Sequence, residues 1–160
     1  MCARVARPAW SRGPSTSPLY GAALVTLSVL ANIDVDDLAR ATEFYCSALG
    51  LRVGRRFEVS VVELLGGSTS IYLLKQSSGT PASSASAARR DYTRHWTPVH
   101  LDFVVPDISA ALARALSAGA ILEGEVRTHK WGRIAAMADP FGHGFCLIEF
   151  LGRGYDEIAS

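Results

Sequence analysis

The chain has 160 residues, of which 19% are charged, and its formal net charge is +1 at pH 7. This length is typical of one domain, or of two small halves that share a core. No basic stripe is evident, so nothing predicts a nucleic-acid partner, and no apolar run reaches the roughly 20 residues that a membrane span needs. Three cysteines without metal-type spacing favour a reducing, cytoplasmic environment over a disulfide framework.

Residues 1–20 differ in composition from the rest of the chain. They contain Arg4, Arg7 and Arg12, several proline, glycine and serine residues, and no acidic residue. We therefore predict a disordered N-terminal extension. Because the apolar stretch 22–30 follows it, a signal peptide or an organelle transit peptide is the alternative interpretation.

A strand followed by a helix is predicted at 99–118. Alternate side chains of a strand face opposite ways, so one side of 99–105 is apolar, while the other carries His100 and Asp102. Asp107 can cap the helix, and Gly119 can end it. The unit has an apolar back, which needs a covering layer, and a polar front.

The same unit occurs earlier in the chain, at 30–50. When Asp37 is aligned with Asp107, Asn32 falls on Asp102 and Leu30 falls on His100. Each helix is followed by three strand-like runs, at 51–59, 61–65 and 70–75 and again at 120–128, 133–138 and 144–151. This repeat predicts an α+β fold of two tandem βαβββ modules.

The predicted organisation has five parts. The N-terminal extension 1–20 precedes a first module at 21–75, and a second module follows at 97–151. The intervening linker, 76–96, begins with a Ser/Ala/Gly-rich stretch. A short polar tail, 152–160, ends the chain.

Two local motifs accompany the repeat. The first module contains Phe44-Tyr45 and then Leu49-Gly50-Leu51, and the second contains the turn Asp139-Pro-Phe-Gly. Together with the two modules, these motifs resemble the vicinal oxygen chelate superfamily of glyoxalases, bleomycin-resistance proteins and extradiol dioxygenases, over residues 22 to 151. The resemblance implies a curved, mixed, mostly antiparallel sheet cup with the helices on its convex side. It also implies a homodimer, whereas the chemistry varies on this scaffold.

In metal-using members of the superfamily, four ligands come from the first and fourth strands of each module. The matching positions here are Leu30, Tyr72, His100 and Cys146. His100 alone is a usual ligand at its usual place, and divalent sites generally need three protein ligands. We therefore expect neither a metal nor another cofactor. Glu149 offers no replacement, because it is predicted to face the helix side of the sheet.

The candidate site residues follow from the polar front and the resemblance. His100 and Asp102 are either a catalytic acid–base pair or hydrogen-bonded sheet residues. Cys146 has the features of an inert buried thiol more than those of a nucleophile. The predicted ligand-binding set is Leu30, Asn32, Tyr72, His100, Asp102, Trp131, Arg133, Cys146, Ile148 and Phe150. His143, inside a turn sequence, is expected at the surface.

Three kinds of function remain open. The preferred one is a metal-independent protein that binds a small, partly aromatic molecule in the cup. The second is an enzyme, either a metal-assisted or a His100-based lyase, isomerase or dioxygenase. The third is a structural or regulatory dimer with a vestigial cup. In all three a homodimer is expected, with the segment 89–96 as a candidate contact.

Overall fold

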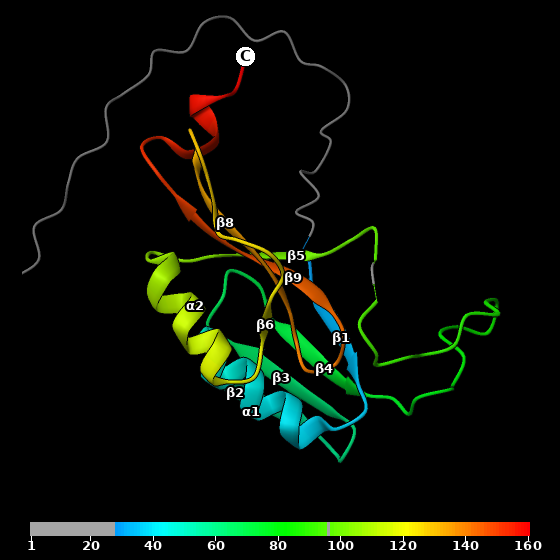
Figure 1. Ribbon diagram of the computed structural model, residues 1–160. Coiled ribbons are helices and arrows are strands. Elements are labelled where there is room, and N and C mark those ends of the chain that lie inside the picture. Colours follow the sequence, from blue (N-terminus) through cyan, green and yellow to red (C-terminus); the bar gives the residue numbers. More distant parts are fainter. Residues whose placement is uncertain (1–27, 96) are drawn as a thin grey trace, which may run out of the picture.

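The computed structural model describes residues 28–95 and 97–160, so the predicted extension 1–20 lies outside the described residues. The chain forms two βαβββ modules (Figure 1). The first contains β1 (Ala31–Val35), α1 (Leu38–Leu49), β2 (Arg52–Phe57), β3 (Val61–Leu65) and β4 (Ile71–Lys75). The second contains β5 (Leu101–Val104), α2 (Ile108–Ser117), β6 (Ile121–Leu122), β7 (Arg127–His129), β8 (Gly132–Ala138) and β9 (Gly144–Phe150), and a short 3-10 helix, η1 (Gly154–Glu157), follows.

Both helices begin at the predicted aspartates. The side chain of Asp37 accepts a hydrogen bond from the Arg40 main chain at the start of α1. Asp107 caps α2 in the same way, through the main-chain N–H groups of Ser109 and Ala110. These bonds satisfy donors that the first turn of a helix leaves free. Gly50 follows α1 in the left-handed conformation, with φ of 68°.

The strands form two mixed sheets, one from each module. The first has the order β1-β4-β3-β2 and the second the order β5-β9-β8-β6, with β7 also paired to β8. The pairs β1–β4 and β5–β9 are parallel, and the other pairs are antiparallel. The α+β fold of two βαβββ modules is thus confirmed. Among residues 28–95 and 97–160, no strand pair joins the two sheets, and β1 and β5 are edge strands.

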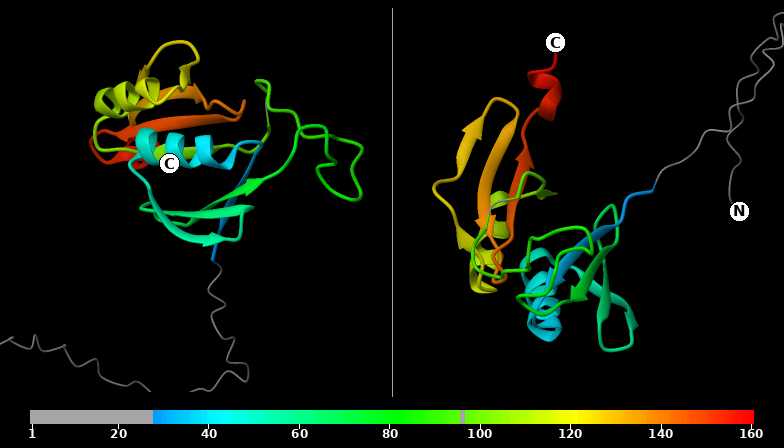
Figure 2. Two further views of the ribbon diagram at one scale, coloured as in Figure 1. Left: turned by 90° about the horizontal axis from the view of Figure 1, so that it is seen from below. Right: turned by 90° about the vertical axis from the view of Figure 1, so that its right-hand side faces the viewer.

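One hydrophobic core serves both modules. The helices α1 and α2 lie side by side, with the strands of the two modules on either side of them (Figure 2), and pack against each other. Val35, Leu73 and Leu147 are fully buried in the same apolar cluster as Ile108 of α2. The Tyr45 hydroxyl on α1 donates a 2.6 Å hydrogen bond to Asp139 of the second module. The helix-covered faces of both sheets therefore hold the modules together.

Two segments differ in detail from the predicted elements. The run predicted as one strand at 120–128 forms two short strands, β6 and β7, which pair with different parts of β8. In the linker, Arg90 forms a 2.6 Å ion pair with Asp34 of the first module. No helix within residues 28–95 and 97–160 is long and apolar enough to cross a membrane.

Candidate functional site

The face of each sheet opposite the helices carries a row of aligned side chains. Residues paired across neighbouring strands point to the same side of a sheet. The aligned residues are Asn32, Tyr72 and Glu63 in the first sheet and Asp102, Cys146 and Ala136 in the second. Their strand neighbours, such as Leu73 and Leu147, are buried beneath the helices. The predicted polar front is therefore the face that the helices leave open.

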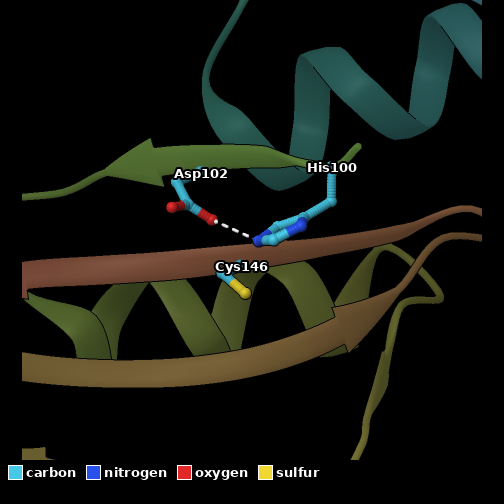
Figure 3. Close-up of side chains that lie close together, drawn as sticks. All are labelled: His100, Asp102 and Cys146. Atoms are coloured by element: carbon cyan, nitrogen blue, oxygen red, sulfur yellow. Dashed lines mark ion pairs between the residues drawn. The ribbon is translucent and has the colours of Figure 1, made fainter. Parts of the chain in front are cut away.

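His100, Asp102 and Cys146 form a cluster on the second sheet (Figure 3). His100 precedes β5, and Asp102 is paired in register with Cys146 of β9. The Nε2 atom of His100 lies 3.2 Å from Oδ1 of Asp102, and these side chains are 52% and 41% exposed. One ligand-type atom from each of the three residues lies within 4.8 Å of the other two. A small molecule that reaches this face would meet a nitrogen, an oxygen and a sulfur group together.

The thiol of Cys146 carries its proton at neutral pH. Burial raises the pKa of Cys146 to about 11, with smaller contributions from the charge of Asp102 and from a hydrogen bond with Asp102. The charge of Arg127 acts in the opposite direction and lowers this pKa slightly. The thiolate is the form that attacks as a nucleophile or binds a metal. The surroundings of Cys146 therefore disfavour nucleophilic attack, and a metal ion at this cluster would first have to displace the thiol proton.

A groove of about 850 Å³ lies between the edge strands β1 and β5. The predicted binding residues Leu30, Asn32 and His100 line it, together with apolar side chains such as Ile33 and Phe103. The groove thus combines residues from both modules. Apolar surface predominates in its walls, as is typical of small-molecule sites, and charged or polar side chains from the linker, such as Arg90 and His95, also line it.

A second polar cluster lies on the first sheet and joins Arg55, Glu63 and Tyr72. Glu63 is only 4% exposed. Its carboxylate accepts hydrogen bonds from the Arg55 main chain at 3.1 Å, from Arg55 Nε at 2.8 Å, from Arg55 Nη2 at 2.6 Å and from the Tyr72 hydroxyl at 2.8 Å. These bonds, chiefly those from the Arg55 side chain, lower the pKa of Glu63 to about 2. Tyr72 therefore belongs to this cluster and not to the one around His100.

Trp131 and Phe150 lie together near the end of β9. Tyr155, from η1, joins them, with its ring centroid 4.9 Å from that of Trp131 and 4.8 Å from that of Phe150. The ring of His129 stacks on Trp131 at 5.3 Å. Ile148 occupies the same sheet face as Phe150 and is buried. The contribution of Tyr155 was missed, because a short polar tail gives no sign that it folds back on the sheet.

Arg133 faces away from the polar front, contrary to its expected place in the ligand site. Its Nη1 atom lies 3.5 Å from Oε2 of Glu149. Glu149 also accepts a 3.2 Å hydrogen bond from the main chain of Ile108, the first residue of α2. Glu149 is thus on the helix side, as the alternation of β9 predicts, and Arg133, its partner in register, shares that side. Arg133 is the one member of the predicted set that the structure places on the helix side.

His143 is not the simple surface residue that the sequence suggested. It is partly buried, and its Nε2 atom lies 2.8 Å from the main-chain oxygen of Asp34 in the first module. Its Nδ1 atom lies 3.2 Å from Nε2 of His95 in the linker, and the ring of Tyr92 packs edge-on against it. His143 therefore connects both modules to the linker. Its turn-like neighbours gave no signal of this long-range role.

These features define a class of protein in which two βαβββ modules share a core and leave the polar faces of their sheets open. Residues 31–148 match the family described as Glyoxalase-like domain. The chain belongs to that family, and the resemblance to the glyoxalase/bleomycin-resistance/dioxygenase superfamily is confirmed.

Similar proteins support the same assignment of fold. An uncharacterized protein of Mycobacterium tuberculosis, Rv0887c, is 29% identical over 116 residues, which cover 71% of this chain and 68% of that protein. The fosfomycin resistance protein FosX from Listeria monocytogenes has a TM-score of 0.62 at 16% identity, covering 85% of this chain and 100% of its own. TnmS3, an antibiotic binding protein from Streptomyces sp. CB03234, has a TM-score of 0.57 at 22% identity, covering 80% and 98%. At these identities the two structures bear on the fold alone.

Proposed function

We propose that this protein binds a small, partly aromatic molecule in the groove between β1 and β5, beside His100 and without a metal ion. The observation that carries the proposal is the groove of about 850 Å³ between β1 and β5. Its volume is within the usual range for organic ligands, roughly 300–1,000 Å³. Phe103 and Ile33 would contact the apolar part of the ligand, and His100 would exchange hydrogen bonds with a polar part.

The side chains at the four superfamily ligand positions do not fit a shared divalent ion. Leu30 has no donor atom, and the Tyr72 hydroxyl is engaged with Glu63. The high pKa of Cys146 keeps its thiol protonated, so that a zinc ion would have to displace this proton before it gained a sulfur ligand. His100 and Asp102 alone fall short of the usual three protein ligands. These donors support binding without a cofactor.

The functions of similar proteins agree with a binding role. TnmS3 is described as an antibiotic binding protein and FosX as a fosfomycin resistance protein. By this analogy the ligand is a drug-like organic molecule. The alternative is a His100-based lyase, isomerase or dioxygenase, which the 3.2 Å contact between His100 and Asp102 favours. Such a pair is able to move a proton to or from a bound substrate.

We also propose a cytoplasmic homodimer. The edges of β1 and β5 are open, and exposed apolar side chains such as Val99 and Val104 lie beside them. Covering such edges is a common reason for strands to pair between chains. The linker residues 89–92 and 95 border the groove, and the segment 89–96 is a candidate part of the contact. Cys46 and Cys146 are unpaired thiols, which is typical of a reducing compartment.

The proposal can be tested with the neutral fluorescent dye phenyl naphthylamine as a probe. Asn32→Trp places a large ring in the groove and is expected to weaken dye binding at least about fivefold by excluding the dye from its site. Ala110→Trp, on the exposed side of α2, is the matched control and should leave the dye affinity within about twofold. Absence of dye binding, or equal effects of the two variants, would contradict the proposed site.

The absence of a metal requires a separate measurement. Elemental analysis of protein purified without a His tag or chelator is expected to find no stoichiometric Mg, Mn, Fe, Ni or Zn. A bound metal that disappears in His100→Ala would overturn the metal-free proposal and favour the enzyme. Light scattering tests the dimer, and a particle of about 17.1 kDa at micromolar concentration would rule it out.

A further inference from the structure

The strand β2 is interrupted by a bulge that directs Arg55 onto the open face. Val53 pairs with Leu64 and Arg56 with Val62, so that both Gly54 and Arg55 lie opposite Glu63. A bulge of this kind re-aims a side chain and is frequent beside functional sites. The first bulge residue has to be small here, because a Cβ at Gly54 would approach Glu63 Oε2 to 2.6 Å. The glycine leaves room for the carboxylate to lie beneath the Arg55 guanidinium.

The Arg55 guanidinium is held in one orientation. Two of its nitrogens donate to Glu63, and Nη2 also lies 3.1 Å from the Tyr72 hydroxyl. The ring of Phe57 packs against it, with the guanidinium carbon 5.4 Å from the ring centroid. The Arg55 side chain is nevertheless 66% exposed, and within residues 28–95 and 97–160 no acceptor receives a hydrogen bond from Nη1. An oriented cation with unused donors thus points away from the sheet.

Stabilisation of the fold does not by itself explain why an exposed arginine is paired with a buried acid. An ion pair with an exposed partner stabilises a fold weakly, whereas burying the Glu63 carboxylate opposes folding unless it is fully hydrogen-bonded. Its four hydrogen bonds compensate that burial and fix Arg55. A buried acid that fixes an exposed arginine is instead well suited to present the arginine to a ligand.

The guanidinium reaches from β2 to Tyr72 on β4, the strand next to β1, and β1 borders the proposed ligand groove. Tyr72, which contacts Arg55, is in register with Asn32 on the neighbouring strand β1, and Asn32 lines the groove. Neighbouring strands are about 4.8 Å apart. A ligand of two or three rings that extends from the groove past Asn32 and over Tyr72 would therefore bring a substituent within reach of Arg55.

We propose that Arg55 recognises an anionic oxygen substituent, such as a carboxylate, phenolate or sulfonate, on the aromatic ligand. Glu63 and Tyr72 are positioning residues that orient the guanidinium. The inference rests on the proposed function, because the aromatic part of the ligand is bound by the groove. It adds the charge of the ligand, which the groove alone does not specify.

Two dyes that differ in one group provide the test. Anilinonaphthalene sulfonate has the ring system of phenyl naphthylamine and carries an added sulfonate. The main variant is the double substitution Arg55→Gln/Glu63→Gln, which removes the cation without leaving a buried carboxylate unpaired and keeps the formal net charge unchanged. Arg52→Gln, on the same strand, is the control for loss of a surface arginine. Thermal unfolding of each variant verifies that it is folded.

The double variant is expected to bind the sulfonated dye about tenfold more weakly than the unmodified protein does, which corresponds to the loss of one charge-assisted hydrogen bond. Its affinity for the neutral dye should stay within about twofold of that of the unmodified protein. Arg52→Gln should change neither affinity by more than about twofold. An unchanged affinity of the double variant for the sulfonated dye, or an equal loss for both dyes, would overturn the proposed role of Arg55. The proposed function would still stand. If neither dye binds the unmodified protein, or if Asn32→Trp weakens neither, the proposed function fails and this inference fails with it.

Discussion

Replacing Tyr45 by phenylalanine removes a hydrogen bond that connects the two modules while keeping the aromatic ring. The hydroxyl of Tyr45 lies 2.6 Å from Asp139 Oδ2, and both residues are buried. Burial and the neighbouring Asp139 raise the pKa of Tyr45 well above its ordinary value, so that the hydroxyl remains a donor. The other oxygen of Asp139 accepts bonds from the main chains of Phe141 and His143. The variant would leave one buried carboxylate oxygen without its donor.

A hydrogen bond to a charged group contributes about 1.5–3 kcal/mol, and an unsatisfied buried partner brings the loss toward the upper end. We therefore expect Tyr45→Phe to lower the free energy of unfolding by about 2–3 kcal/mol. For a chain of this size the corresponding decrease in Tm is roughly 4–12 °C. Urea titration followed by tryptophan fluorescence and circular dichroism would measure the change.

Tyr155→Phe is the matched control for the loss of a phenolic hydroxyl. Tyr155 is 48% exposed, so its substitution should change stability by less than about 0.5 kcal/mol. If Tyr45→Phe is as stable as this control, the bond to Asp139 does not hold the modules together. A change in the slope of the titration would instead indicate that the modules unfold separately.

Three further predictions concern pH, thiol reactivity and backbone packing. The pKa of Glu63 is lowered from 4.5 to about 2, so the stabilisation by its ionised form is present above pH 4.5 and is lost as the pH falls toward 2. Glu63→Gln should therefore lose less stability than the unmodified protein across that pH range. Urea midpoints that fall equally with pH in the two proteins would contradict this. Because the pKa of Cys146 is about 11, its thiol should react with iodoacetamide at pH 8 about 100-fold more slowly than an ordinary cysteine. Asp102→Asn should accelerate this reaction, as followed by peptide mass spectrometry. An unchanged rate would show that Asp102 does not raise the pKa of Cys146. Gly142→Ala should destabilise the fold by about 3 kcal/mol or more, because the φ of Gly142 is +83° and the added Cβ would overlap the main-chain oxygen of Thr93. A melting temperature equal to that of the unmodified protein would contradict this close approach of Gly142 to Thr93.

Much of the fold could be predicted from local patterns. The alternation around Asp102 and Phe103 determines which side of β5 is covered, because a one-residue shift would expose the apolar side chains. The aspartates and glycines at the helix ends gave the bounds of α1 and α2 for the same local reason. The repeat then related Asn32 to Asp102. Periodicity of this kind depends only on neighbours in the chain.

The parts that were missed depend on irregular backbone or on distant contacts. Arg55 would face the helix side in a regular β2 strand, and it is the bulge at Gly54 that turns it to the open face. The burial of Glu63 could not be predicted from the sequence, because it depends on hydrogen bonds from Arg55, whose direction the alternation of β2 does not give. His143 contacts Asp34 across the chain, and nothing in its own turn sequence indicates such a partner.

The polar groups at the superfamily ligand positions are occupied separately within each module. In the first sheet the Tyr72 hydroxyl is bound to Glu63, and in the second the Cys146 proton is retained beside Asp102. A single ion that joined the two modules would have to break both arrangements, at the cost of leaving buried groups unpaired. An organic ligand would break neither, because the unused donors of Arg55 and the exposed ring of His100 point outward from intact clusters. Intact clusters of this kind are what the proposed metal-free binding of an organic molecule requires.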